Sequence, residues 1–158
     1  MGDPGVAEAP AGYRLVAHGR AMVDSGPLIA LFNAADRWHA PVLAWLEAHP
    51  SVHLVSTWPV LTEVCALLAR RLNNAAALDF LTWVERGAVR VDAPVAATVA
   101  EVRRLSQRFS SLPFDLADAS VAEAAERLGI EGVLSIDADF DVYRNARGKP
   151  LLNLLRTA

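Results

Sequence analysis

The chain has 158 residues, of which 53% are hydrophobic and 21% charged, and its formal net charge is −3. These values predict one packed domain and exclude wholesale disorder and a basic surface over the whole chain. The single cysteine excludes an internal disulfide and a cysteine-based zinc site. No apolar run approaches the ~20 residues of a membrane span, and the first residues do not resemble a secretory signal. We therefore expect a cytoplasmic protein that does not bind a membrane.

The first part of the chain differs from the rest in composition. Residues 1–19 are rich in Gly, Ala and Pro and have no sustained hydrophobic period, so we expect a flexible N-terminal extension. Residues 20–158 are expected to form one domain.

Strands and helices alternate along this domain. In the first half, the pattern predicts a strand at 20–24, helices at 25–34 and 39–49, a strand at 52–56 and helices at 57–72 and 73–87. In the second half, it predicts a strand at 88–92, helices at 94–109 and 115–128, a strand at 133–136, a helical turn at 139–144 and a short strand at 151–155. Short connections between such elements indicate a three-layer α/β/α sandwich around a parallel sheet of four or five strands.

The first strand ends on an acid, Asp24, immediately before a predicted helix. Ser25 is a good N-cap, and Gly26 and Pro27 suit the first turn. Chemistry collects at the carboxyl ends of strands in open parallel sheets, so Asp24 is a candidate site residue. The alternative is that Asp24 merely helps to cap the helix.

Other carboxylates also lie next to apolar sequence. Glu63 is inside a helix, Asp115 and Asp118 lie three residues apart at the start of another, and Asp137 and Asp139 follow a strand. Each has an ordinary alternative as a cap, a first-turn acid or an exposed residue. Asp24 and Asp137 meet if the strand order is 3-2-1-4-5, an order that the sequence does not show. Carboxylates that converge need bound protons or a cation, and oxygen ligands suit Mg²⁺ or Mn²⁺.

Four motifs with these acids together resemble the PIN-domain ribonuclease family, and in particular the VapC-type toxins of bacterial toxin–antitoxin pairs. The motifs are Val23-Asp24-Ser25-Gly26, Thr62-Glu63-Val64, Asp115-Leu-Ala-Asp118-Ala119 and Leu134-Ser-Ile-Asp137-Ala-Asp139-Phe140. The resemblance implies a metal-dependent endoribonuclease that uses Mg²⁺ or Mn²⁺, an RNA substrate, a cognate antitoxin and a homodimer.

The resemblance also implies roles for individual residues. The acidic quartet that binds metal and carries catalysis is matched by Asp24, Glu63, Asp118 and Asp137. Asp115 and Asp139 match acids that often accompany the quartet. Ser25 and Ser135 match hydroxyl residues that hydrogen-bond to the ligands.

Two arginines extend this hypothesis. Arg70 lies seven residues after Glu63 on the same helix face, and with Arg71 it is a candidate contact for an RNA phosphate. The alternative is a solvated helix end whose charge favours the helix dipole.

Two other functions compete with a nuclease. A non-catalytic binding module would use the acids to hold a structural ion or an arginine of a partner. A metal-dependent phosphatase typically has a second acid two residues after its nucleophilic Asp, but position 26 is Gly, so this function ranks well below. A nuclease that acts on DNA is a variant of the main hypothesis.

Overall fold

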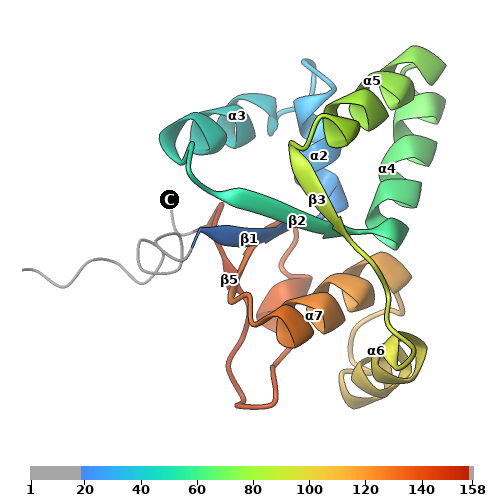
Figure 1. Cartoon of the computed structure of the whole chain (residues 1–158), viewed down its shortest axis with the longest axis vertical. Helices are drawn as coiled ribbons and strands as arrows, with labels where there is room; N and C mark the ends of the chain where they lie inside the picture. The colour runs from blue at the N-terminus through green and yellow to red at the C-terminus, as the bar shows by residue number, and fades with distance from the viewer. Residues whose placement is uncertain (1–18, 157–158) are drawn as a thin grey trace, which may run out of the picture.

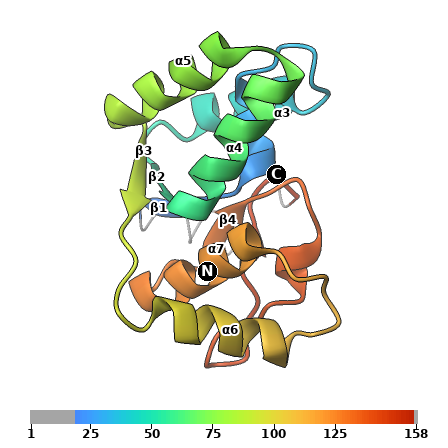
Figure 2. The same cartoon turned by 90° about the vertical axis from the view of Figure 1, so that its right-hand side faces the viewer.

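The computed structural model describes residues 19–156, which form three layers (Figures 1 and 2). A parallel sheet lies in the middle. Helices α2 to α5 cover one face, while α6 and α7 cover the other (Figure 2). The predicted α/β/α sandwich is therefore confirmed. The predicted extension at 1–19 lies outside the described residues except for Gly19, and none of the described helices combines the length and apolarity that crossing a membrane requires.

Helices and strands alternate as the hydrophobic pattern predicts. The strands are β1 (Arg20–Val23), β2 (His53–Thr57), β3 (Val89–Asp92), β4 (Gly132–Leu134) and β5 (Leu152–Asn153). The helices are α2 (Ser25–Leu31), α3 (His39–Ala48), α4 (Trp58–Arg71), α5 (Asn74–Glu85), α6 (Thr98–Arg108), α7 (Leu116–Leu128) and the 3-10 turn η1 (Asp139–Asp141).

The strand order is β3-β2-β1-β4-β5, and every neighbouring pair is parallel. Met22 of β1 aligns with Val55 of β2 on one side and with Val133 of β4 on the other. The order reverses between β1 and β4, because β2 and β3 continue in one direction from β1 while β4 and β5 continue in the other. Such a reversal opens a crevice at the carboxyl ends of the strands, where open α/β sheets bind ligands.

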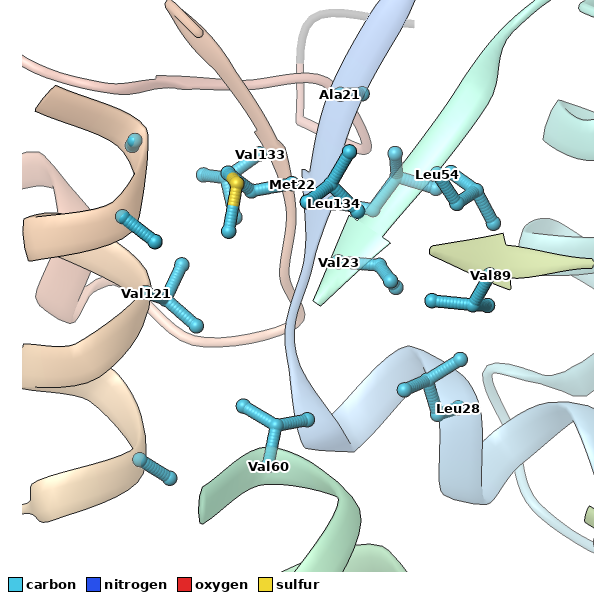
Figure 3. Close-up of a cluster of buried hydrophobic side chains, with 14 of the residues drawn as sticks. Ala21, Met22, Val23, Leu28, Leu54, Val60, Val89, Val121, Val133 and Leu134 are labelled. Atoms are coloured by element: carbon cyan, nitrogen blue, oxygen red, sulfur yellow. The ribbon is translucent and has the colours of Figure 1, made fainter. Parts of the chain in front are cut away.

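Alternate residues of β1 contribute to the two halves of the core. Met22 lies on the side of Val121 from α7, whereas Val23 lies on the side of Leu28 from α2 (Figure 3). These side chains are at most 1% exposed. The apolar strand therefore fixes the sheet between its two helical layers and holds the residue that follows it, Asp24, at the crevice.

Several local predictions were wrong. Ser25 is not the N-cap of α2: Asp24 is, and its side chain accepts from the Ser25 backbone N–H. Pro94 does not open α6, which begins four residues later at Thr98. The predicted helices at 39–49 and 57–72 do not bury all of their apolar residues: Leu43 and Leu72 are 41% and 42% exposed, because periodicity alone does not tell which apolar positions a neighbouring element covers.

Candidate active site

Asp24 is the most deeply buried acid of the crevice, with only 1% of its surface exposed. Its backbone N–H donates to the Leu134 carbonyl at 3.0 Å, which continues the ladder between β1 and β4 by one residue. The side chain therefore leaves the sheet where β1 passes into α2. The two alternatives for Asp24, a site residue and a helix cap, are therefore not exclusive, since Asp24 caps α2 and also lies in the crevice.

Both carboxylate oxygens of Asp24 accept hydrogen bonds. The Ser25 backbone N–H donates to Oδ1 at 2.7 Å, and the Ser25 hydroxyl donates weakly to the same oxygen at 3.5 Å. The fully buried Ser135 hydroxyl donates to Oδ2 at 3.1 Å and accepts from the backbone N–H of Asp137, also at 3.1 Å. Ser135 thus connects the acid after β1 to the segment that carries the acid after β4.

A glycine permits this close approach of the two segments. A Cβ atom on Gly26 would lie 2.5 Å from Cγ1 and 2.6 Å from Cδ1 of Ile136. Carbon atoms do not approach so closely without displacement of the side chain. Gly26 therefore lets the first turn of α2 pack against the residue between Ser135 and Asp137.

The first turn of α7 brings two more acids to the crevice. Asp115 is the N-cap, and its Oδ1 accepts from the Asp118 backbone N–H at 2.9 Å. Asp118 is 8% exposed, and its carboxylate has no hydrogen-bond or ion-pair partner within residues 19–156. It is therefore a buried carboxylate placed near a helix N-terminus without a direct partner.

Burial and mutual repulsion disfavour the charged forms of both acids. Burial raises the pKa of Asp24 from 3.8 to about 6; the hydrogen bonds from Ser25 and Ser135 oppose the rise, and the charges of Asp137 and Glu63 add to it. Burial also raises the pKa of Asp118 to about 8, with repulsion first from Asp24 and then from three further carboxylates, those of Asp115, Asp139 and Asp137. Each of the other four predicted acids therefore acts on Asp24, on Asp118 or on both.

The six acids differ in exposure. Glu63 on α4, Asp115 and Asp139 are half-buried, and Asp137 is exposed. The two arginines predicted to contact phosphate lie in the last turn of α4, exposed, and about 10 Å along the helix axis from Glu63. They are therefore outside the immediate surroundings of the acids.

The oxygen atoms of these carboxylates are chemically suitable ligands for a hard divalent cation. The donor set consists of carboxylate oxygens with uncompensated charge, supported by hydroxyl groups that orient Asp24, and such oxygens are the ligands that Mg²⁺ and Mn²⁺ prefer. As the side chains stand, no group of three or more Asp, Glu, His or Cys residues in the described part is already arranged around a metal position. Binding a cation would therefore require side-chain adjustment.

Sequence reasoning missed two features beside the acids. Thr57, predicted to cap α4, makes no cap hydrogen bond; its hydroxyl pairs with that of Ser120 on α7 at 2.6 Å, which joins β2 to α7. The ring of Tyr143 is buried close to Asp118 and Asp115, whose charges act on its hydroxyl. The four-residue spacing from Asp139 to Tyr143 was the only signal for the second feature.

Comparison with known proteins gives one family. Residues 21–146 match the family model for the PIN domain. A curated relative, ribonuclease VapC26 of Mycobacterium tuberculosis, is 27% identical over 116 residues, which cover 73% of this chain and 85% of the relative.

Solved structures agree on the fold. VapC20 of Mycobacterium tuberculosis, described as a toxin that cleaves the sarcin–ricin loop, superposes with a TM-score of 0.71 at 24% identity and covers 77% of this chain and 92% of its own. VapBC2 of Rickettsia felis, bound to a promoter DNA fragment, gives 0.59 at 13% identity and covers 85% and 96%. FitAcB of Neisseria gonorrhoeae gives 0.55 at 19% identity and covers 85% and 97%.

Proposed function

The chain belongs to the PIN-domain family, and from this premise we propose that it is a VapC-type endoribonuclease toxin that depends on Mg²⁺ or Mn²⁺. The observation that carries the proposal is the pair Asp24 and Asp118: two buried carboxylates whose pKa values are raised to about 6 and about 8 by burial and by repulsion from neighbouring carboxylates. Burying acids in this way is costly unless a cation joins them.

In the proposed mechanism, Asp24 and Asp118 would hold the metal, and Glu63 and Asp137 would bind or orient it or its water. A bound cation would supply activation of water against a phosphodiester and stabilisation of the charge that develops on the phosphorus oxygens. Ser135 and Ser25 keep the Asp24 carboxylate in one orientation through their hydrogen bonds. Asp115 and Asp139 supply additional negative charge that favours the cation. The expected products carry 5′-phosphate and 3′-hydroxyl ends.

The proposal is tested by cleavage of RNA with purified protein in Mn²⁺. We expect Asp24→Asn and Asp118→Asn to remain folded and to lose roughly 10³-fold or more of the cleavage rate, and a chelator to abolish cleavage by the wild type. Glu101→Gln, on the surface of α6, is the matched control and should cleave normally. Full Mn²⁺-dependent cleavage by both aspartate variants would refute the assignment.

The alternative function, a non-catalytic binding module, makes the opposite prediction in the same assay. It would bind the cation, or an arginine of a partner, at the same acids but leave RNA intact. Substrate choice extends the proposal: the likeness to VapC20, described as cleaving the sarcin–ricin loop, favours a structured RNA. Mapping of new RNA ends after expression identifies the target, and DNA of the same sequence tests the preference for RNA.

The proposal also includes two protein partners, an antitoxin and a second copy of this chain. The structural likeness to VapBC2 and FitAcB supports a cognate antitoxin that covers the acids in the cytoplasm. We also propose a homodimer. One candidate dimer surface, on α3 to α5, includes exposed Leu78, and a second apolar surface beside α6 includes exposed Val99. Light scattering measures the molar mass of Leu78→Glu and Val99→Glu, and the variant that becomes monomeric identifies the dimer surface. A monomeric wild type would contradict the proposed homodimer.

A further inference from the structure

Tyr143 combines a buried ring with a hydroxyl that has no partner among residues 19–156. The residue is 5% exposed, and its ring contacts Phe109 edge-on at 5.5 Å and Phe140 at 6.1 Å between ring centroids. Packing between two aromatic rings leaves the phenol little freedom to move. Tyr143 therefore presents its hydroxyl from a fixed position.

The hydroxyl of Tyr143 makes no hydrogen bond with any described residue. It is nevertheless not sealed inside the protein, because Ser106 Oγ is the single fully buried side-chain polar atom without a partner in residues 19–156. A buried phenol usually satisfies its hydroxyl within the protein. The free, reachable hydroxyl of Tyr143 is thus open to a group from outside.

Tyr143 comes four residues after Asp139, and its ring contacts Phe140, the residue next to Asp139. Tyr143 also lines an open groove of about 810 Å³ together with Leu116 and Ser120 from α7, and a second hollow together with Ala122; the six acids are not among the residues that line these two spaces. Asp118 and Ala122 are four residues apart and so share one face of α7. In agreement with this position, the charge of Asp118, followed by those of Asp115 and Asp139, adds to the effect of burial and raises the pKa of Tyr143 to about 12.

An RNA phosphate that approaches this crevice meets several carboxylates and needs hydrogen-bond donors as well as a cation. The hydroxyls of Ser25 and Ser135 already donate to Asp24. Tyr143, by contrast, remains protonated at any working pH and its donor is uncommitted.

We propose that the Tyr143 hydroxyl donates a hydrogen bond to a non-bridging oxygen of an RNA phosphate next to the scissile one, and so positions the substrate against Asp118. The inference rests on the proposed ribonuclease function and deepens it. Tyr143 contributes binding and orientation; it neither gives up its proton nor attacks phosphorus.

Tyr143→Phe tests the inference, because it removes the hydroxyl and keeps the ring between Phe109 and Phe140. We expect kcat/KM for a short RNA that the wild type cleaves to fall roughly 10-fold or more, as for loss of a hydrogen bond to a charged group. The melting temperature should stay within about 2 °C of wild type, since no protein hydrogen bond is lost. Tyr13→Phe removes the hydroxyl of the other tyrosine in the chain and serves as the matched control.

A sulfur-substituted RNA identifies the contact itself. A phosphorothioate at the phosphate on either side of the scissile one should slow the wild type at one of the two positions, and the same substitution should have no additional effect on Tyr143→Phe. The shape of the pH–rate profile should be unchanged in this variant, because a phenol that never ionises in the assay contributes no titration.

Three results would overturn the inference. The first is a kcat/KM of Tyr143→Phe within about twofold of wild type, which is too small for a lost hydrogen bond to a charged group. The second is a sulfur effect that persists unchanged in the variant at both positions. The third is absence of cleavage by the wild type itself, which also refutes the proposed function, whereas the first two leave that function standing.

Discussion

Two groups of buried acids in this domain differ in what balances their charge. Asp92 at the end of β3 and Glu123 on α7 both pair with Arg127, which donates to Asp92 and, at 2.8 Å through Nε, to Glu123. These hydrogen bonds raise the pKa of Arg127 further above its ordinary value. Asp24 and Asp118 have no cationic partner among residues 19–156, and burial raises their pKa values instead.

This difference in charge balance distinguishes acids that stabilise the fold through ion pairs from acids that can bind a ligand. The pairs with Arg127 tie β3 to α7 and are complete within the chain. The crevice between β1 and β4 concentrates like charges that the chain leaves unbalanced. Because α7 carries members of both groups, its two faces allow the same helix to stabilise the sheet and to present Asp118 for chemistry.

The largest expected effect is the response of the unbalanced group to a cation. Mn²⁺ at about a hundred times its dissociation constant should raise the free energy of unfolding by about 2.7 kcal/mol. Thermal unfolding with and without the metal measures this gain. Arg127→Met should retain the shift and Asp118→Asn should lose most of it; an equal shift in both variants would place the metal elsewhere.

Breaking the balanced group should lower stability in metal-free protein. Arg127→Met leaves Asp92 and Glu123 without their cation, and we expect a loss of about 2 kcal/mol, below the value for a fully buried pair because Arg127 is 25% exposed. Denaturant unfolding measures the loss. Arg104→Met removes a pair with Glu101 on the surface of α6 and should cost at most about 0.5 kcal/mol. Similar losses of unfolding free energy for both variants would mean that burial does not strengthen the Arg127 pairs.

The same chemical change should have opposite signs in the two groups. Asp118→Asn removes a carboxyl group whose ionised form is disfavoured in the folded chain, and it should raise the metal-free melting temperature at pH 7 by about 2–4 °C, which corresponds to about 1 kcal/mol. Asp92→Asn removes a paired charge and should lower it by a similar amount. Scanning calorimetry in a chelating buffer gives both values, and a shift in the same direction for the two variants would contradict the comparison.

The last prediction concerns how the free energy of unfolding changes with pH. Unfolded Asp118 loses its proton near 3.8, whereas in the folded chain it retains the proton up to about 8. Folded protein thus binds more protons in between, so the stability of metal-free protein should fall as pH rises from about 5 to 8. Asp24 adds to the slope up to about pH 6. The unfolding free energy should change less steeply with pH in Asp118→Asn than in wild type. Equal slopes would mean that groups other than Asp118 cause the pH dependence.

Much of this arrangement is predictable from the sequence because it depends on residue type and local spacing. The alternation of apolar strands with helices predicts the layers, and every acid of the crevice except Glu63, which lies inside α4, is next to an element end that the pattern identifies. Asp115 as the N-cap of α7 is an example that the structure confirms.

Contacts between distant segments were not predictable in the same way. The four-residue spacing of Glu123 and Arg127 indicates a pair on one helix, but the third member, Asp92, comes from a strand 35 positions before Arg127. The order of the strands and the position of Tyr143 likewise depend on packing among elements. The cap of α2 was wrong because Asp24 and Ser25 are both good caps, and only the backbone geometry distinguishes them.

The hydrogen bond from Ser135 to Asp24 has a consequence for synthesis on the ribosome, because it joins residues 111 positions apart. β1 emerges early, but its partner β4 and the acids of the second half follow only when most of the chain has been translated. A nascent polypeptide that stops before β4 already contains Asp24 and Asp118 but lacks Ser135 and Asp137. Whatever chemistry these acids perform together, it therefore begins only after the ribosome has translated past β4.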